Sequence, residues 1–369
     1  MNYKTKKEID EAREMLSPPG DTLAETLEAK GISQTELASR TGRAKKTINE
    51  IIRGKASISP EMAIQLEKVL GISSDFWMER DRNYYLELAE LEEAENKLKA
   101  RDWARQFPLN EMRKLGWIDY KQNSDLEKVN SIFHFFGVSN QNAFEEHYHK
   151  NIYKGAFRYS EKKQKNPYAI AAWLRQGELQ AEKMGAIDFS EKKFKEKLKH
   201  IKNLMAKHPE DFFEQLQKIC LEAGVKILHT PKLPKAPING STRWLNDNPV
   251  IQLTDRYKRN DIFWFTFFHE AGHVLLHGKK NIFLEFEGYK DEDREKEEEA
   301  NEFAIKWTLT KKQETEVRES LPLKDQEISN FAHQFNTHPA IIIGRLQKFG
   351  AINQSEGRAF FEKVDLSKN

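Results

Sequence analysis

Two histidines and a glutamate occur close together in the segment HEAGH, which spans residues 269–273. On a helix, positions 269 and 273 are one turn apart, so both imidazoles lie on one face and can bind the same metal ion. A carboxylate beside the first histidine can take a proton from a water molecule that such an ion activates. The sequence therefore predicts His269 and His273 as zinc ligands and Glu270 as a catalytic general base.

The residues around this motif favour a functional site over a chance match to the motif. The segment FWFTFFHEAGHVLLH is rich in aromatic and aliphatic residues, which predicts a buried helix beginning near Asp261. A buried helix rarely carries two histidines and a carboxylate unless they are paired or bind a metal. The alternative, core histidines that match the motif by coincidence, is the weaker interpretation.

A catalytic zinc ion needs a third protein ligand. His277 is eight residues beyond His269, about 12 Å along the helix axis, so both rings could hardly reach one ion. The acidic helix predicted over residues 295–309 offers carboxylates instead. At about 100° per residue, Glu297 and Glu299 both border the apolar face of that helix. We expect Glu297 as the ligand, with Glu299 as the second candidate.

Two further residues are candidates for the same cleft. Arg243 lies on a predicted strand, residues 241–245, where it could stabilise an oxyanion as a second catalytic residue. His338 precedes a proline at a helix start and could enter the site. For both, a packing or surface role is the competing interpretation.

Residues 21–80 contain the capping and turn residues that are typical of short helices joined by tight turns. Ser33 and Glu36 form a capping box, Thr41 and Gly42 make a turn, and a second helix is predicted from Ala44 to Arg53. Such a pair can place its second helix in the major groove of DNA. Seven basic and only two acidic residues lie between positions 30 and 55, which favours phosphate binding.

Several polar side chains of this helix pair are suited to base edges and phosphates. The predicted DNA-binding residues are Gln34, Lys45, Lys46, Thr47, Asn49 and Arg53. A helical bundle with a solvated basic face remains the alternative.

The composition limits the class of protein. The chain has 369 residues, 38% of them hydrophobic, a net charge of +2 and one cysteine, which excludes an internal disulfide framework and fits a reducing compartment. The densest apolar run, residues 262–268, is about a third of the length that a membrane span needs. We therefore expect a cytoplasmic protein that does not bind membranes.

The patterns predict a mainly α-helical chain with a small β-sheet, of the α+β class. Strands are expected at residues 225–228, 241–245 and 250–253. The predicted domains are a helix-turn-helix bundle (14–80), a helical connector or dimerisation region (81–200), a metallopeptidase domain (201–350) and a C-terminal tail (351–369).

The segment GSTRWLNDNPVIQLTDRYKRNDIFWFTFFHEAGHVLLHG, followed by EEEANEFA, resembles the ImmA/IrrE family of metallopeptidases. The family pattern Glu-x-x-Ala-Asn-x-Phe-Ala falls on Glu297, Ala300, Asn301, Phe303 and Ala304. The resemblance implies a zincin-like fold and Glu297 as a gluzincin-like third ligand. It also implies a cytoplasmic enzyme that cleaves repressors with helix-turn-helix domains. Thr310 departs from the proline that commonly closes this helix in the family.

Residues 18–78 closely resemble the HigA-type antidote group within the Xre-like helix-turn-helix family. This resemblance implies a homodimer that binds a palindromic operator in double-stranded DNA and often represses its own toxin–antidote operon.

Two main functions remain open at this point, besides a weaker third one, a DNA-binding protein whose zinc is purely structural. In the first, the protein binds DNA and its zinc endopeptidase cleaves a protein, either a helix-turn-helix repressor or its own linker near residues 80–110. In the second, it is an antitoxin and autorepressor whose peptidase-like domain binds a cognate toxin or senses a signal with little proteolysis. Histidine and carboxylate ligands also accept manganese or iron, so the sequence leaves the metal open.

Overall fold

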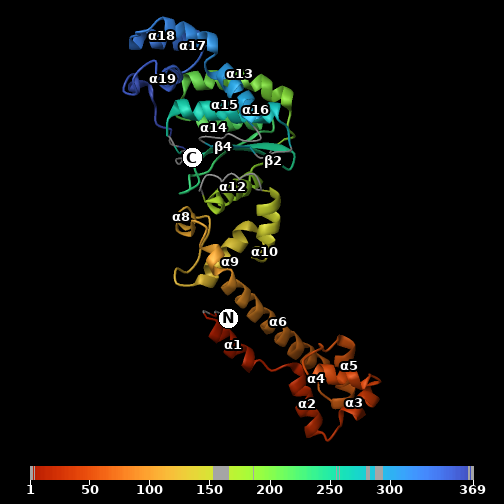
Figure 1. Cartoon of the computed structure of the whole chain (residues 1–369). Helices are drawn as coiled ribbons and strands as arrows, with labels where there is room; N and C mark the ends of the chain where they lie inside the picture. Colours follow the sequence, from red (N-terminus) through yellow and green to blue (C-terminus); the bar gives the residue numbers. More distant parts are fainter. Residues whose placement is uncertain are drawn as a thin grey trace. The chain divides into compact units, whose positions relative to one another are not determined.

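The computed structural model describes residue 3 and residues 5–152, 166–185, 187–254, 256, 258–279, 283–286, 294–364 and 366 (Figure 1). The chain forms two compact units. One consists of Met1–Ala104 with Asp119–Gln141, and the other of Arg105–Ile118 with Asn142–Asn369. We call them the N-terminal and the C-terminal unit and treat each by itself.

The described part of the N-terminal unit is helical. Its elements are α1 (Lys6–Met15), α2 (Pro19–Ala29), α3 (Gln34–Thr41), α4 (Lys45–Ile52), α5 (Pro60–Leu70), α6 (Ser74–Lys99), α7 (Arg101–Ala104) and α9 (Asp125–Phe136). The start of α10 (Gln141–Phe144) also belongs to it.

Serine caps and left-handed glycines set the helix boundaries in this unit. The hydroxyl oxygens of Ser33 and Ser59 accept the backbone N–H groups of Glu36 and Met62. Gly42 ends α3 in the left-handed conformation, with φ of 66°, which glycine adopts at least cost. The predicted helix pair is therefore confirmed, with α3 and α4 close to the expected boundaries.

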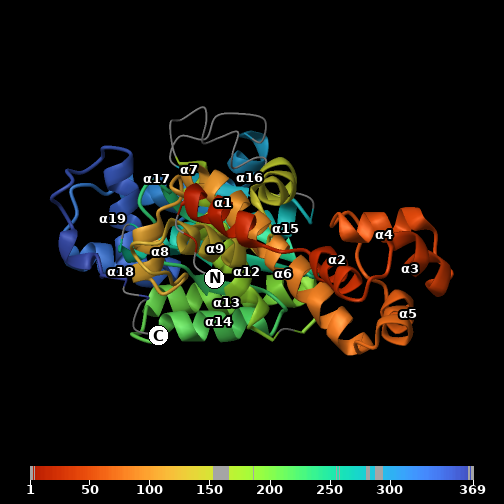
Figure 2. The same ribbon diagram turned by 90° about the horizontal axis from the view of Figure 1, so that it is seen from below.

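The core of the helix-turn-helix bundle is formed by aliphatic side chains from α2 to α5. Leu37, Ile48, Ile51 and Leu66 are buried there, as predicted, and Trp77 at the start of α6 covers them. Figure 2 shows α2 to α5 gathered around this centre.

The C-terminal unit combines helices with a sheet. Its helices are α8 (Leu109–Lys114), the π-helix η1 (Glu145–Ile152), α12 (Pro167–Glu182), α13 (Glu191–Lys207), α14 (Phe212–Leu221), α15 (Asn260–Leu276), α16 (Arg294–Thr308), α17 (Lys311–Glu319), α18 (Asp325–Phe335), α19 (Pro339–Lys348) and the 3₁₀-helix η2 (Arg358–Phe360). Its strands are β1 (Lys226–His229), β2 (Ile238–Leu245), β3 (Asn248–Leu253) and β4 (Phe283–Phe286).

The sheet has the strand order β1-β3-β2-β4. β1 pairs parallel to β3, while β2 pairs antiparallel to both β3 and β4. In Figure 1, α14 and α15 cover one face of the sheet and α12 lies on the other. The two-sided coverage explains why the middle of β3 is buried throughout. The α+β class and the three predicted strands are confirmed, whereas β4 and α17 were not predicted.

The boundaries of the two units divide the predicted connector (81–200) between them. Residues 81–104 and 119–141 belong to the N-terminal unit, and the rest of the connector belongs to the C-terminal unit. The predicted tail is also packed, because Val364 and Leu366 are buried in the main core of the C-terminal unit. The backbone of Lys363 pairs with that of Arg259 and keeps this segment beside the start of α15.

Within the described parts of the chain, none of the helices combines the length and the apolar character that crossing a bilayer requires.

Candidate metal centre and helix-turn-helix surface

The predicted metal ligands come from α15 and α16, two helices that pack closely. Gly272 is the reason that they can approach, since a Cβ atom there would lie 3.2 Å from the Cα of Ala300. The rings of Phe268 and Trp307 stack further along the contact, with centroids 6.1 Å apart. This packing fixes the position of the α16 carboxylates relative to α15.

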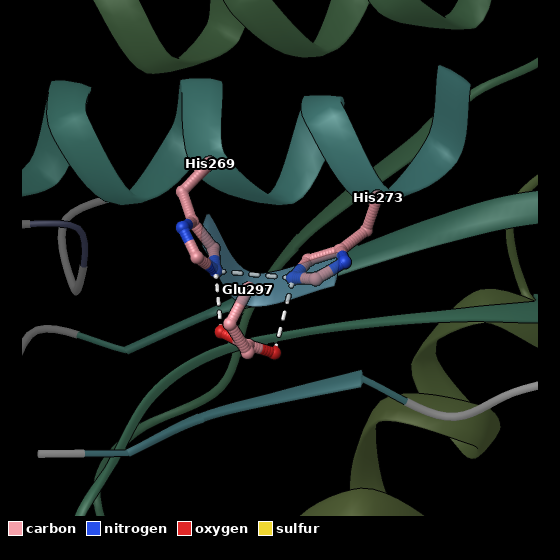
Figure 3. A group of neighbouring side chains, drawn as sticks. All are labelled: His269, His273 and Glu297. Carbon is pink, nitrogen blue, oxygen red and sulfur yellow. Dashed lines mark hydrogen bonds and ion pairs between the residues drawn. The ribbon is translucent and has the colours of Figure 1, made fainter. Parts of the chain in front are cut away.

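Figure 3 shows His269 and His273 pointing from α15 toward Glu297 of α16. The two histidine Nε2 atoms are 3.0 Å apart. Oε2 of Glu297 lies 3.2 Å from Nε2 of His269, and Oε1 of Glu297 lies 3.4 Å from Nε2 of His273. Within the described residues, the ligand atoms of these three side chains all fall within 4.8 Å of one another. The structure thus brings Glu297, and not Glu299, to the two histidines.

The ionisation of this cluster suits metal binding. Burial lowers the pKa of His273 to about 4, against the opposing effect of Glu297. Burial alone would raise the pKa of Glu297, but its hydrogen bonds with His269 and His273 outweigh burial and lower that pKa to about 2. Near neutral pH, His273 is therefore neutral and Glu297 is ionised, which are the forms that bind a metal.

The spacing of the donor atoms also fits a tetrahedral ion. Zinc bonds of about 2.0–2.1 Å place neighbouring tetrahedral ligands about 3.3–3.4 Å apart. The two Nε2 atoms are 3.0 Å apart, and each lies 3.2 to 3.4 Å from one of the two Glu297 carboxylate oxygens, which are distances of similar length. Two imidazoles and one carboxylate, with a fourth position left open, is the donor set of catalytic zinc sites. The residues present therefore fit a zinc ion.

Each histidine has a hydrogen-bond partner on its other ring nitrogen. Nδ1 of His269 lies 3.2 Å from Oδ1 of Asn301, and Nδ1 of His273 lies 2.8 Å from Nδ1 of His277. His277 continues to Glu299, with Nε2 and Oε2 2.9 Å apart. Such partners hold the rings in the tautomer that directs Nε2 at a metal.

The sequence interpretation did not include these supporting roles. The sequence suggests His277 only as a possible ligand, although its position four residues after His273 indicates contact between the two side chains. Asn301 lies four residues after Glu297 on α16 and so shares its face.

Glu270 is completely buried and faces the sheet. Its Oε2 atom accepts a hydrogen bond of 2.6 Å from the hydroxyl of Thr242 on β2. Gly240, two residues before Thr242, leaves room for this carboxylate, since a Cβ there would lie 2.7 Å from Oε1 of Glu270. The predicted base is thus held against β2 by a residue that the sequence interpretation missed.

Arg243 is not part of this centre, and its predicted catalytic role is wrong. Successive residues of a strand point to opposite faces, so Arg243 faces α12 while Thr242 faces α15. The buried guanidinium donates hydrogen bonds to the carbonyl oxygen of Leu174 and, at 2.9 Å, to Oε1 of Gln252. Arg243 therefore joins α12 to the sheet.

His338 also lies outside the metal-ligand cluster. It caps α19, where Nδ1 accepts the backbone N–H of Ala340, and its Nε2 pairs with Glu362 at 3.0 Å. The suggestion that it enters the site is wrong, because its partners lie at the start of α15 and in the C-terminal segment.

The predicted DNA-binding side chains lie on the outward side of α3 and α4. Lys45, Lys46 and Arg53 are exposed, whereas Gln34, Thr47 and Asn49 are partly exposed. The apolar positions Ile48 and Ile51 face the core, which turns the basic positions outward. Among the described residues, none caps the N-terminus of α4 with its side chain, so the first amides of this helix are available to an anion.

Comparison with known families finds matches to two separate regions of the chain, one in each unit. Residues 23–77 match the helix-turn-helix family, and residues 214–346 match the IrrE N-terminal-like domain. Both predicted resemblances are thereby confirmed.

Curated relatives match only a short part of the chain. One is an uncharacterised HTH-type transcriptional regulator, YddM, from Escherichia coli (strain K12), with 36% identity over 72 residues, 20% of this chain and 77% of the relative. Another is the virulence-associated protein A of Dichelobacter nodosus, with 36% identity over 61 residues, 16% of this chain and 60% of the relative.

Two solved structures are similar to this chain over about a fifth of its length. They are the Pseudomonas aeruginosa antitoxin HigA with the higBA promoter (35% identity, 20% of this chain and 82% of that chain, TM-score 0.20) and an addiction module antidote protein of the HigA family from Coxiella burnetii (27% identity, 23% and 91%, TM-score 0.21). From its sequence matches, the chain belongs to the helix-turn-helix family through its N-terminal unit and carries an IrrE N-terminal-like, peptidase-related domain in its C-terminal unit.

Proposed function

We propose that this protein is a DNA-binding transcriptional regulator that is also a zinc-dependent endopeptidase. One observation carries the enzymatic part of the proposal. The ligand atoms of His269, His273 and Glu297 lie within 4.8 Å of one another, and the buried Glu270 is the next residue after His269. A site that only held a structural metal would not need this carboxylate.

His269, His273 and Glu297 would hold the zinc ion, which would supply a Lewis acid for the scissile carbonyl and a water nucleophile. Glu270 would take the proton of that water and later give it to the leaving amine. The Thr242 hydroxyl orients the Glu270 carboxylate for this transfer. Asn301 and His277 keep the two imidazoles in position.

The proposed substrate is a protein, either a helix-turn-helix repressor or the chain's own segment near residues 80–110. Among the described strands, β4 is at the edge of the sheet next to β2, which also carries Thr242. A sheet edge can align an extended peptide by backbone pairing, which suits an endopeptidase.

For the N-terminal unit we propose binding to a palindromic operator as a homodimer, with α4 in the major groove. The exposed Lys45, Lys46 and Arg53 support contact with phosphates and bases. The relative YddM is described as a transcriptional regulator, which agrees with this role.

The test of the enzymatic proposal combines metal analysis with cleavage. The Glu270→Gln protein is expected to retain about one zinc per chain and to lose cleavage of a co-expressed repressor and of itself. Its matched control is Glu298→Gln, an exposed carboxylate on α16 that pairs with Arg294. Wild-type protein without zinc after reconstitution, or the same fragments from Glu270→Gln, would refute the proposal.

A second candidate is an antitoxin and autorepressor whose C-terminal unit binds a toxin or a signal without proteolysis. The observation in its favour is the exposure of Leu276 (51%) at the end of α15 and of Phe349 (54%) just after α19, both in the C-terminal unit, since exposed apolar side chains suit a protein partner. Full repression and toxin neutralisation by Glu270→Gln, with no substrate cleaved by wild type, would favour it.

A further inference from the structure

A cavity of about 290 Å³ lies in the C-terminal unit, apart from the metal-ligand cluster. It is lined by the first turns of α15, the end of α16, α19 and the segment around residue 354. Its walls include Phe265, Thr308, Ile341, Arg345 and Lys348. The volume is close to the lower end of the range for small-molecule sites, about 300–1,000 Å³.

The charged groups of this cavity are mainly cationic. Among the described residues that line it, Arg259, Arg345 and Lys348 are cationic and Asp261 alone carries a carboxylate. Asp261 is occupied by Arg259, whose Nε and Nη2 atoms donate to it at 2.9 and 2.7 Å. Arg345 and Lys348 also line the cavity and add positive charge to it.

Arg345 is 93% buried, and its ion pair with Glu314 is long. Among the described residues, its Nε atom lies 3.9 Å from Oε2 of Glu314, beyond hydrogen-bond range. Burial lowers the pKa of this guanidinium, although Glu314 and Glu302 oppose the effect. Burial of a guanidinium whose ion pair lies beyond hydrogen-bond range is costly, and an anion in the adjoining cavity would relieve part of that cost.

Both cations lie over the aromatic ring of Phe265. The guanidinium carbon of Arg345 is 5.6 Å from the centroid of Phe265, and the Lys348 ammonium is 5.4 Å from it. Ile262 and Ile341 add apolar surface to the same walls. The lining of the cavity therefore combines cationic groups with apolar surface.

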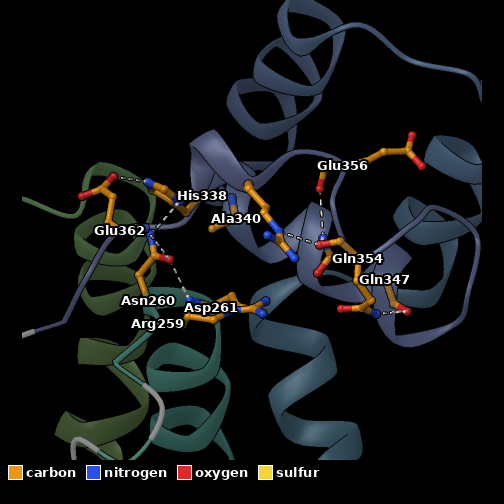
Figure 4. A network of polar contacts seen from close by, with 10 residues as sticks. Arg259, Asn260, Asp261, His338, Ala340, Gln347, Gln354, Glu356 and Glu362 are labelled. Carbon is orange, nitrogen blue, oxygen red and sulfur yellow. Dashed lines mark hydrogen bonds and ion pairs between the residues drawn. The ribbon is translucent and has the colours of Figure 1, made fainter.

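Hydrogen bonds hold the surrounding segments in place, as Figure 4 shows. On one side, Asn260, His338 and Glu362 connect the start of α15 to α19 and the C-terminal segment. On the other, the Gln347 side chain donates to the carbonyl oxygens of Gln354 and Glu356. A cavity between such linked segments is formed before a ligand arrives.

We propose that this cavity binds a small organic anion, a carboxylate with a planar apolar body. Its carboxylate would meet Arg345 and Lys348, and its body would lie against Phe265 and Ile341. The proposal does not depend on zinc or on proteolysis, since none of these residues is in the metal-ligand cluster.

The test uses the full-length protein and two fluorinated probes of nearly the same shape, 4-fluorobenzoate and the neutral 4-fluorobenzamide. Fluorine NMR titration gives a dissociation constant for each probe. We expect the benzoate to bind at least about tenfold more tightly than the amide, because one charge-assisted hydrogen bond corresponds to about that factor. Lys348→Gln and Arg345→Gln should each remove most of this difference, while Lys312→Gln, an exposed cation on α17, should preserve it.

His269→Ala separates this site from carboxylate binding at the metal centre, and benzoate should bind this variant as it binds wild type. If Arg345→Gln fails to fold, the test rests on two other variants, Lys348→Gln at an exposed position and Phe265→Leu. Equal affinity for benzoate and benzamide, or unchanged benzoate affinity in Lys348→Gln and Phe265→Leu, would overturn the proposal. Loss of benzoate binding in His269→Ala alone would overturn it as well.

Discussion

At the scale of single residues, the metal-ligand cluster combines side chains whose pKa values favour one ionisation pattern. Burial lowers the pKa of His273, and hydrogen bonds from both histidines lower that of Glu297. Neutral imidazole and ionised carboxylate can then coexist near neutral pH. This pattern lets the cluster take up a divalent ion with little proton release.

The first prediction concerns Glu297 as the third ligand. Glu297→Gln should weaken zinc binding by at least about a hundredfold, because an amide replaces the charged donor. Glu298→Gln, one residue along α16 and exposed, should bind zinc as wild type does. Competition with a chromophoric chelator measures both affinities. Equal affinities in the two variants would show that Glu297 is not a ligand.

The second prediction concerns the partner of His273. His277→Ala removes the group that contacts its Nδ1 atom, so zinc affinity should fall about ten- to a hundredfold. The protein should still bind one zinc ion, since the three ligands remain. The same chelator titration is the measurement, and an affinity within about twofold of wild type would contradict the positioning role.

The third prediction is a pH dependence that involves His208. Its Nδ1 atom accepts a 3.0 Å hydrogen bond from Trp264, and burial, with a smaller effect from His338, lowers its pKa from 6.5 to about 4. The unfolded chain therefore binds this proton more readily than the folded chain. The stabilisation is fully present above pH 6.5 and is lost as the pH falls toward 4.

Urea unfolding at pH 7 and pH 5 tests this dependence. His208→Asn suits the site because residue 208 has φ of 40°, a conformation that asparagine tolerates. The loss of unfolding free energy between the two pH values should be smaller in the variant, by about 2 kcal/mol. An identical pH dependence in both proteins would exclude His208 as its source.

At the scale of elements, glycines decide how closely helices approach. Gly20 in the first turn of α2 lies against the end of α4, where an added Cβ would be 2.2 Å from the carbonyl oxygen of Ile51 and 2.5 Å from that of Ile52. These are backbone atoms, so the contact cannot be relieved by turning a side chain. The position of α4, and with it the proposed DNA-binding face, depends on this contact.

The fourth prediction follows from that contact. Gly20→Ala should destabilise the N-terminal unit by about 1–3 kcal/mol and weaken operator binding, because α4 must move. Glu25→Ala, an exposed position on the same helix, is the control and should change stability little. Thermal unfolding by circular dichroism gives the comparison, and an unchanged midpoint in Gly20→Ala would refute the argument.

At the scale of the whole molecule, two compact units each have their own hydrophobic core. Units with separate cores can unfold in separate transitions. Because a ligand stabilises only the unit that binds it, zinc is expected to act on the C-terminal unit.

The fifth prediction is therefore a calorimetric trace with two transitions. Chelation of zinc should lower the midpoint of one transition, and Gly20→Ala should lower the midpoint of the other. Glu297→Gln should behave like chelation. If both treatments shift the same transition, or if the protein unfolds in a single step, the two units are not energetically independent.

Local patterns in the sequence were sufficient to predict the helix-turn-helix, three strands, the motif helix and the pair His269 and His273, since caps, turns and one-turn spacings act within a few residues. The sequence also favoured Glu297, but only the packing of α16 against α15 excluded Glu299 as a ligand. Contacts between distant segments cannot be predicted from periodicity. Which face of β2 Arg243 occupies, which residue holds Glu270, and how residues 81–200 divide between two units were therefore decided by the tertiary structure, in which close packing selects one arrangement.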